Sequence, residues 1–246
     1  MNIFNNTLRD KNTPWDKVWI PPWKRALDIS LIILALPFLL PVVLVIALII
    51  RIVSEGPIFF RQERIGRDGK KFLCFKFRTM IVGANSVSHE GHLRQLIYSD
   101  IPMTKMDAKG DPRIIPFGVL LRATGLDELP QLINVLRGDM SIVGPRPCLP
   151  YEFDHYLPWQ YERCSVAPGL TGLWQVSGKN KTTFSEMIRL DIEYSRRRSM
   201  MFDLEIIFRT IPALLTQVLE TPLKKAAPKT VATEPETVFP VHAANH

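Results

Sequence analysis

The stretch Ile29–Ile50 reads ISLIILALPFLLPVVLVIALII, and its 22 residues include no charged side chain. An apolar run of this length matches the roughly 20 residues that an α-helix needs to cross the hydrocarbon core of a bilayer. A secretory signal peptide has a shorter apolar region, about 7–15 residues long, that lies closer to the N-terminus. The run therefore predicts a helix embedded in a membrane, and this helix sets the class of fold to expect.

Basic residues flank the apolar run on both sides. Those closest to it include Lys24, Arg25, Arg51, Arg61 and Arg64. Because basic residues at the ends of a membrane segment favour the cytoplasm, both ends prefer the same side. Pro37 and Pro41 can kink a helix, and a bend at Pro41 would give arms of about 18 and 15 Å, each roughly half of the hydrocarbon thickness. Two arrangements stay open at this point: a re-entrant helix that returns to the face where it entered, and a kinked helix that crosses the bilayer.

Composition divides the 246-residue chain into four expected segments, which are 1–22, 23–54, 55–219 and 220–246. The first is polar with tryptophans spaced by four, which is typical of a helix at the membrane interface. The second holds the membrane helix, and the third is long enough for one catalytic domain. The last is rich in Pro, Ala, Thr and Lys, which predicts a disordered tail.

Charge and cysteine content exclude several classes of protein. The net charge is +7, but no nucleic-acid-binding motif accompanies it, so we expect no nucleic-acid partner. Cys74, Cys148 and Cys164 are the three cysteines, and their spacing suits neither a zinc site nor a disulfide framework. Reduced thiols of a cytoplasmic domain are the expected state.

After Gly56 the pattern changes to short apolar runs that are typical of strands. Ile58–Arg61 and Lys71–Phe77 flank the turn sequence GRDGK, which predicts a β-hairpin. Helical spacing follows in DELPQLINVLRG, residues 127–138, and again in 183–198. Residues 203–219 predict an amphipathic helix that lies on the bilayer or packs on the domain. Together these patterns predict an α+β domain that is attached to a membrane by its N-terminal helix and by amphipathic interfacial helices.

Asp127 and Glu128 stand side by side in GLDELPQ, residues 125–131. One interpretation is structural, with Asp127 capping the next helix and Glu128 in its first turn. The other is chemical, because neighbouring segments are rich in cations that suit phosphate groups. These cations are Lys76, Arg78, Arg113, Arg122, Arg137 and Arg146. An aspartate can attack a phosphate only where cationic groups neutralise the phosphate oxygens, so an acid pair amid cations suits a phosphate and a divalent metal ion.

Four blocks of the sequence resemble the bacterial sugar transferases, which are monotopic phosphoglycosyl transferases. The blocks are KRALDISLI at 24–32, GPIFFRQERIGRDGKKF with FKFRTM at 56–80, DPRIIPFG with LRATGLDELPQLINVLRGDMSIVGPRP at 111–147, and PGLTGLWQVSGKN at 168–180. The resemblance spans about residues 24–215, and it is closest to the short, single-domain enzymes that start exopolysaccharide repeat units. It implies transfer of a sugar 1-phosphate from a UDP-sugar to undecaprenyl phosphate, with release of UMP, at the cytoplasmic face of the inner membrane.

The same resemblance implies roles for individual residues. Asp127 would be the nucleophile that forms a covalent phosphosugar, Glu128 would complete the acid pair, and both would hold Mg²⁺. The expected substrate-binding residues are Lys76, Arg78, Arg113, Arg122, Arg146 and Gln175. The resemblance also favours the re-entrant arrangement of the apolar run. Two positions depart from the family pattern, because Leu40 and Gly125 stand where Ser is frequent in relatives.

Two other functions are compatible with the residues. One is a non-catalytic membrane scaffold for a polysaccharide assembly, and the other is an ordinary glycosyltransferase that moves only the sugar and releases UDP. The expected partners are a UDP-sugar, undecaprenyl phosphate and the membrane, and a homo-oligomer is compatible with the sequence.

Overall fold

The structure, a computed structural model, describes residues 20–83, 96, 97, 102, 111, 113–179 and 181–220. The segment before Ile20 and the chain after Glu220, for which we expect an interfacial segment and a disordered tail, lie outside these residues. In chain order the elements, with η for a 3₁₀ helix, are α1 (Pro22–Val53), β1 (Phe59–Ile65), η2 (Arg67–Gly69), β2 (Lys71–Phe77), α3 (Gly118–Thr124), η4 (Leu126–Glu128), α4 (Gln131–Arg137), β3 (Ser141–Val143), α5 (Pro150–Asp154), η5 (Pro158–Ser165), β4 (Gly169–Thr171), α6 (Leu173–Val176), α7 (Phe184–Arg197) and α8 (Met200–Glu220).

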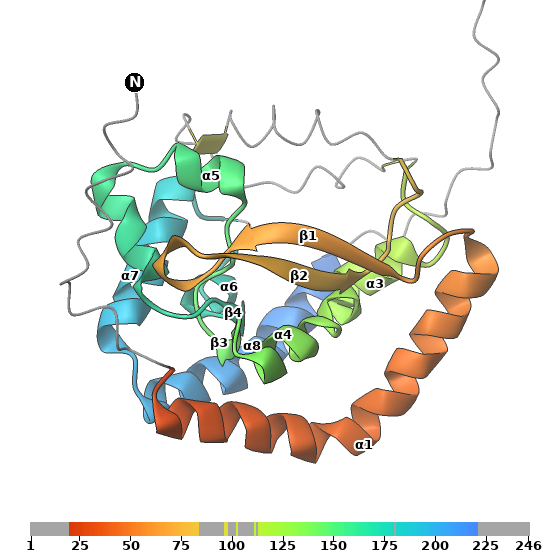
Figure 1. The fold of residues 1–246 in the computed structure, drawn as a ribbon, viewed down its shortest axis with the longest axis horizontal. Coiled ribbons are helices and arrows are strands. Elements are labelled where there is room, and N and C mark those ends of the chain that lie inside the picture. Colours follow the sequence, from red (N-terminus) through yellow and green to blue (C-terminus); the bar gives the residue numbers. More distant parts are fainter. Residues whose placement is uncertain are drawn as a thin grey trace, which may run out of the picture.

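Helix α1 contains the whole apolar run and is bent into two arms (Figure 1). Pro37 and Pro41 lie inside the helix, where each removes a backbone hydrogen bond and favours a kink. In the part of the chain that the structure describes, α1 is the one helix long and apolar enough to cross a membrane. The fold is therefore a mixture of helices and strands with a long apolar N-terminal helix that is compatible with membrane association.

Buried polar contacts join the first arm of α1 to the rest of the domain. The Lys24 ammonium forms an ion pair with Asp203 of α8 and donates to the hydroxyl of Tyr194 on α7 at 2.9 Å. Four residues further along α1, the Asp28 carboxylate accepts from Ser141 Oγ at 2.9 Å. All of these side chains are buried, so the start of α1 is fastened to three other elements.

The far end of α1 returns to the same domain. Ile46 and Ile50 are buried with Phe77, Ile115 and Leu121 in one apolar cluster. Between Ile33 and Val45 most of the apolar side chains are exposed, and Phe38 keeps 76% of its surface accessible. Both ends of α1 therefore rest on one body while its apolar middle remains uncovered.

The predicted β-hairpin is confirmed, with a first strand that is longer than the expected one. β1 and β2 pair antiparallel from Phe59 opposite Phe77 to Ile65 opposite Lys71. A second, parallel pair joins β3 to β4 and brings Gly144 against Gly169. A Cβ atom on Gly144 would meet the Ala167 carbonyl oxygen at 2.4 Å, so this contact requires glycine.

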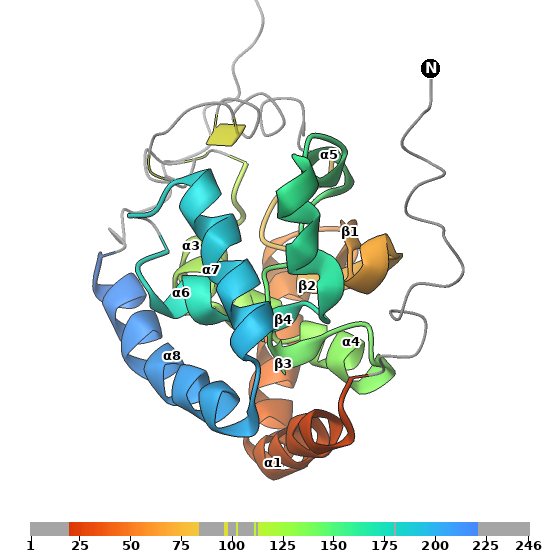
Figure 2. The same cartoon turned by 90° about the vertical axis from the view of Figure 1, so that its left-hand side faces the viewer.

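Helices α7 and α8 lie on one side of the β1–β2 hairpin, to its left in Figure 2. α7 begins with a capping box in which Thr183 and Glu186 each bond the other's backbone N–H. Its apolar face buries Phe184, Met187 and Ile188 in the largest core cluster. α8 packs against α3 and α6, which places it next to the segment that carries the acid pair.

Candidate active site

The acid pair lies in η4, a single turn between α3 and α4. Gly125 ends α3 and begins η4 with a φ of 72°, a left-handed conformation that glycine adopts without steric cost. The residue before α4 is Pro130, and no side chain caps that helix. The interpretation of Asp127 as a cap of the following helix is therefore wrong, and both carboxylates are available for other contacts.

Lys76 of β2 is in direct contact with Glu128 of this pair. Its ammonium lies 2.6 Å from Glu128 Oε1, and both side chains remain partly accessible. Asn134 of α4 holds the strand in place, because its side chain donates to Leu73 O at 2.7 Å and accepts from Phe75 N at 3.1 Å. The helix that follows the acid pair thus also fixes the strand that carries its counter-ion.

The two carboxyl groups are in different electrostatic states. Burial alone would raise the pKa of Glu128, but the charges of Lys76, Lys179 and Arg146 outweigh it and lower the pKa to about 2. At Asp127, burial raises the pKa, and Lys76 and Arg122 oppose that rise only in part. Glu128 is therefore ionised at neutral pH, whereas Asp127 is the carboxyl that takes up a proton more readily.

Three further cations act on the pair from separate elements. Arg146 follows β3, Lys179 follows α6, and Arg122 lies in the last turn of α3. Gln217 of α8 links two of them, since it donates to Arg122 O at 3.2 Å and accepts from Lys179 Nζ at 3.4 Å. The acid pair is thus surrounded by positive charge from four parts of the sequence, as a site for a phosphate ester requires.

Arg78 and Arg113 make contacts with groups other than the acid pair. Arg78 donates to Ser54 O at 3.0 Å and to Pro57 O at 2.6 Å, so it fastens the connection between α1 and β1. Arg113 contacts the Asp111 carboxylate at 2.7 Å. The charge of Arg122 acts on both Asp111 and Asp127, so the Arg113 pair borders the site.

Gln175 lies on α6, the element that leads to Lys179. Its Nε2 donates to Leu170 O at 3.1 Å, while its buried Oε1 accepts no hydrogen bond from the described part of the chain. A buried acceptor without a donor is costly, and a ligand hydroxyl or N–H would satisfy it. The role of Gln175 in a sugar or nucleotide pocket stays a prediction.

The donor set suits Mg²⁺ bound together with a substrate. Among the residues that the structure describes, no group of three or more His, Cys, Asp and Glu side chains is arranged to hold a metal ion by itself. Mg²⁺ in phosphate-transfer sites is held by one or two carboxylates, with phosphate oxygens and waters as the remaining ligands. Asp127 and Glu128 supply these two carboxylates, so the residues fit the ion.

The sequence did not predict the residues that hold Arg146, which are Glu152 and Arg163. The Arg146 guanidinium contacts Glu152 Oε1 at 3.1 Å, and the Arg146 carbonyl accepts from Arg163 at 2.9 Å. Glu152 comes six residues after Arg146, and no motif or periodicity marks it. Lys179 lies in the block 168–180, and its effect on Glu128 depends on long-range folding that this block does not show.

A model of the family described as "Bacterial sugar transferase" matches residues 19–217 of this sequence. The chain belongs to the bacterial sugar transferase family. The exopolysaccharide production protein ExoY of Sinorhizobium fredii is 39% identical over 191 residues, which cover 78% of this chain and 84% of that protein. The UDP-glucose:undecaprenyl-phosphate glucose-1-phosphate transferase of Caulobacter vibrioides is 40% identical over 211 residues, covering 82% and 73% of the two chains.

A third relative of this sugar transferase is much longer. The undecaprenyl-phosphate galactose phosphotransferase of Salmonella typhimurium is 38% identical over 199 residues, which cover 78% of this chain but only 40% of that protein. The acid pair and the segments that carry its cations all lie within the matched residues 19–217. The family assignment therefore includes the whole site.

Proposed function

We propose that this sugar transferase moves a sugar 1-phosphate from a UDP-sugar to undecaprenyl phosphate and releases UMP. The names of its relatives support the reaction class, since they include glucose-1-phosphate and galactose phosphotransferases that use undecaprenyl phosphate. The observation that carries the proposal is the Asp127–Glu128 pair, bound by Lys76 and surrounded by arginine and lysine from other elements.

The reaction has two displacements at one phosphorus atom. An oxygen of the Asp127 carboxylate attacks the β-phosphorus of the UDP-sugar, and the bond from that phosphorus to the bridging oxygen breaks with its electron pair leaving on UMP. A phosphate oxygen of undecaprenyl phosphate then attacks the same phosphorus, and the Asp127 carboxylate is released unchanged. The two anionic substrates thus use one cationic site in turn.

Each neighbouring group has a task in this scheme. Lys76 holds Glu128 ionised beside the nucleophile, and Arg146, Arg122 and Lys179 neutralise charge on the phosphate oxygens. Bound Mg²⁺, held by Asp127 and Glu128, would supply further neutralisation of the diphosphate. The raised pKa of Asp127 means that its nucleophilic form is lost first when the pH falls.

The docked ends of α1 support our proposal for the membrane arrangement. Both arms return to one domain, and both flanks of the apolar run are basic. We therefore place α1 as a re-entrant helix in the inner membrane, with the domain on the cytoplasmic face. This arrangement sets the site beside the headgroup region, where the phosphate of undecaprenyl phosphate lies.

Exchange of the nucleophile tests the reaction directly. Asp127→Asn removes the attacking oxygen anion but keeps the size of the side chain. We expect UMP release to fall by at least about 1000-fold, the scale on which loss of a catalytic group acts, with membrane association retained. The unsubstituted enzyme incubated with donor alone should carry a phosphosugar on Asp127, detectable by mass spectrometry of its peptides.

The nucleotide product separates the rival functions. An ordinary glycosyltransferase releases UDP, and a scaffold releases neither nucleotide. Identification of UDP as the product, or unchanged turnover by Asp127→Asn, would reject the proposal. A panel of UDP-sugars with undecaprenyl phosphate as the acceptor should be used, so that a wrong choice of sugar does not hide the activity.

A further inference from the structure

The loop Pro145–Arg146–Pro147 is held by its carbonyl groups. The prolines on both sides of Arg146 fix their own φ angles and contribute no N–H. The carbonyl oxygens are therefore the main groups by which this backbone can be hydrogen-bonded. All three carbonyls accept hydrogen bonds: Pro145 O from Gly169 N at 2.9 Å, Arg146 O from Arg163 Nη2 at 2.9 Å, and Pro147 O from Arg64 Nη1 at 3.0 Å. The backbone that carries Arg146 is therefore immobilised from three directions.

The two arginines behind this loop are themselves buried and anchored. Arg163 forms an ion pair with Asp191 of α7 and donates to the hydroxyl of Tyr156, and all three side chains are buried. Arg64 of β1 is also buried, and it donates to Gln62 at 2.8 Å. Buried guanidinium groups are costly unless they are paired or hydrogen-bonded, and these contacts hold both arginines in place behind the loop.

The side chain of Arg146 is directed by one carboxylate. Glu152 of α5 has no accessible surface, and its two oxygens lie 3.1 and 3.3 Å from Arg146 Nη1. Arg146 keeps 25% of its side-chain surface accessible, and its charge acts on Glu128 of the acid pair. The guanidinium is thus paired with a buried carboxylate, and its charge acts on the candidate active site.

The charges of this cluster do not cancel. Arg64, Arg146 and Arg163 supply three positive charges, and Glu152 and Asp191 supply two negative ones. Of the three arginines, Arg146 has the most accessible side chain, and its charge also acts on Glu128 of the acid pair. A guanidinium that is partly accessible in this way can bind a phosphate group.

We propose that Glu152 is a positioning residue that orients the Arg146 guanidinium toward the diphosphate of the UDP-sugar, with Arg163 and Arg64 fixing the backbone of the same loop. Glu152 acts through Arg146 and does not touch the substrate itself. This inference rests on the proposed function, because it assigns the Arg146 guanidinium to the diphosphate of that donor.

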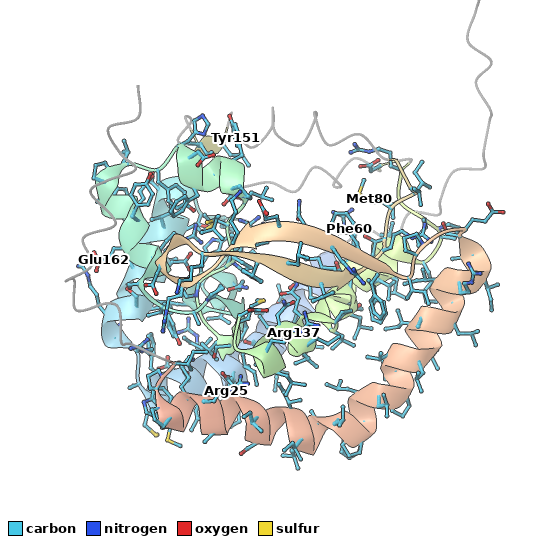
Figure 3. All side chains as sticks on the ribbon, viewed as in Figure 1. Arg25, Phe60, Met80, Arg137, Tyr151 and Glu162 are labelled. Carbon is cyan, nitrogen blue, oxygen red and sulfur yellow. The ribbon has the colours of Figure 1, made fainter. Side chains whose placement is uncertain are left out.

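The test compares UDP binding and donor kinetics in the full-length, detergent-solubilised enzyme with MgCl₂. We expect Glu152→Gln to weaken UDP binding about tenfold and to raise KM for the UDP-sugar by a similar factor, with a smaller change in kcat, since one oriented charge-assisted contact is lost. Glu152→Asp keeps the charge and moves it back by one methylene, so it should give a smaller loss in the same direction. The matched control is Glu162→Gln, because Glu162 binds Arg196 at 2.6 Å on the outer side of the domain (Figure 3) and should leave both quantities within about twofold.

A double-mutant cycle separates positioning from general damage. If Glu152 acts through Arg146, then Glu152→Gln has no further effect on UDP affinity in an Arg146→Gln background. This double variant also removes both partners of the ion pair, so it avoids an unpaired buried charge if Glu152→Gln alone does not fold. An equal loss in both backgrounds would overturn the inference.

The outcomes distinguish this inference from the proposed function. If the unsubstituted enzyme binds UDP and both Glu152 variants bind it equally well, the positioning role is overturned and the proposed function is not. Failure of the unsubstituted enzyme to bind UDP, together with no UMP release from any UDP-sugar, would overturn the proposed function and this inference with it.

Discussion

Lys76 is the side chain whose loss should most directly alter the acid pair. Lys76→Met keeps the aliphatic stem but leaves Glu128 without its nearest counter-ion. A charge-assisted hydrogen bond of this kind contributes about 1.5–3 kcal/mol, so we expect kcat/KM for the UDP-sugar to fall roughly 10- to 150-fold. Initial rates of UMP release provide the measurement.

The same strand offers a matched control for that substitution. Lys71 lies at the other end of β2, where it pairs with Glu63 at 2.8 Å in an exposed position. Exposed ion pairs contribute little, so Lys71→Met should leave the rate within about twofold. A comparable loss in both variants would assign the effect to the hairpin and not to the acid pair.

The lowered pKa of Glu152 also predicts how the stability of the enzyme depends on pH. Burial would raise its pKa, but Arg146, Arg64 and Arg163 outweigh burial and hold the pKa below its usual range. A carboxyl whose pKa is lower in the folded state stabilises the fold above its unfolded pKa of about 4.3, and this contribution is lost as the pH falls through the folded pKa. Thermal unfolding in detergent from neutral pH to about pH 3 should therefore show a loss of stability in acid that is smaller in Glu152→Gln.

At the scale of elements, the ion pair of Lys24 with Asp203 connects α1 to α8. Both side chains are buried, and Tyr194 of α7 bonds to each of them. Removal of one partner from a buried pair costs about 3–5 kcal/mol, because it leaves the other charge uncompensated. Lys24→Met should therefore lower the free energy of unfolding by about this amount, as measured by chemical denaturation in detergent.

The double variant provides the control for this connection. Lys24→Met with Asp203→Asn removes both charges, so its destabilisation should be clearly smaller than the sum of the two single effects. Strict additivity would mean that the two side chains contribute independently, and that the pair is not what joins the helices.

For the whole molecule, the docked ends of α1 predict the accessibility of its flanks. Single cysteines at Ala26 and Val53, introduced into a chain whose own cysteines are replaced by serine, should both resist a membrane-impermeant thiol reagent added to intact cells. Both should react after the cells are opened. Reaction of only one of the two in intact cells would establish a helix that crosses the bilayer, and it would reject the re-entrant arrangement.

Much of the fold follows from local sequence patterns. The hairpin was predictable because two apolar runs flank a Gly-containing turn, and α7 because Thr183 and Glu186 form a capping box before an apolar face. In the hairpin, β1 continues to Ile65, beyond the apolar stretch that ended at Arg61, because backbone pairing extended it. Patterns of this kind depend on neighbours in sequence, so they can be read without the tertiary structure.

The partners of the basic residues could not be predicted in this way. Arg78 and Lys76 are two residues apart, yet one fastens the end of α1 and the other binds Glu128. Arg146 meets Glu152 on α5, while Arg163 reaches the same loop from η5. Which cation meets which carboxylate depends on how distant elements pack, and composition shows only that the charges are present.

The bent form of α1 also has a mechanical consequence for the bilayer. In the re-entrant arrangement, the exposed apolar middle of the helix occupies space among the acyl chains of the cytoplasmic leaflet and adds nothing to the area of the opposite one. Many copies gathered in one patch would expand the cytoplasmic leaflet alone. The bilayer would then bulge toward the cytoplasm.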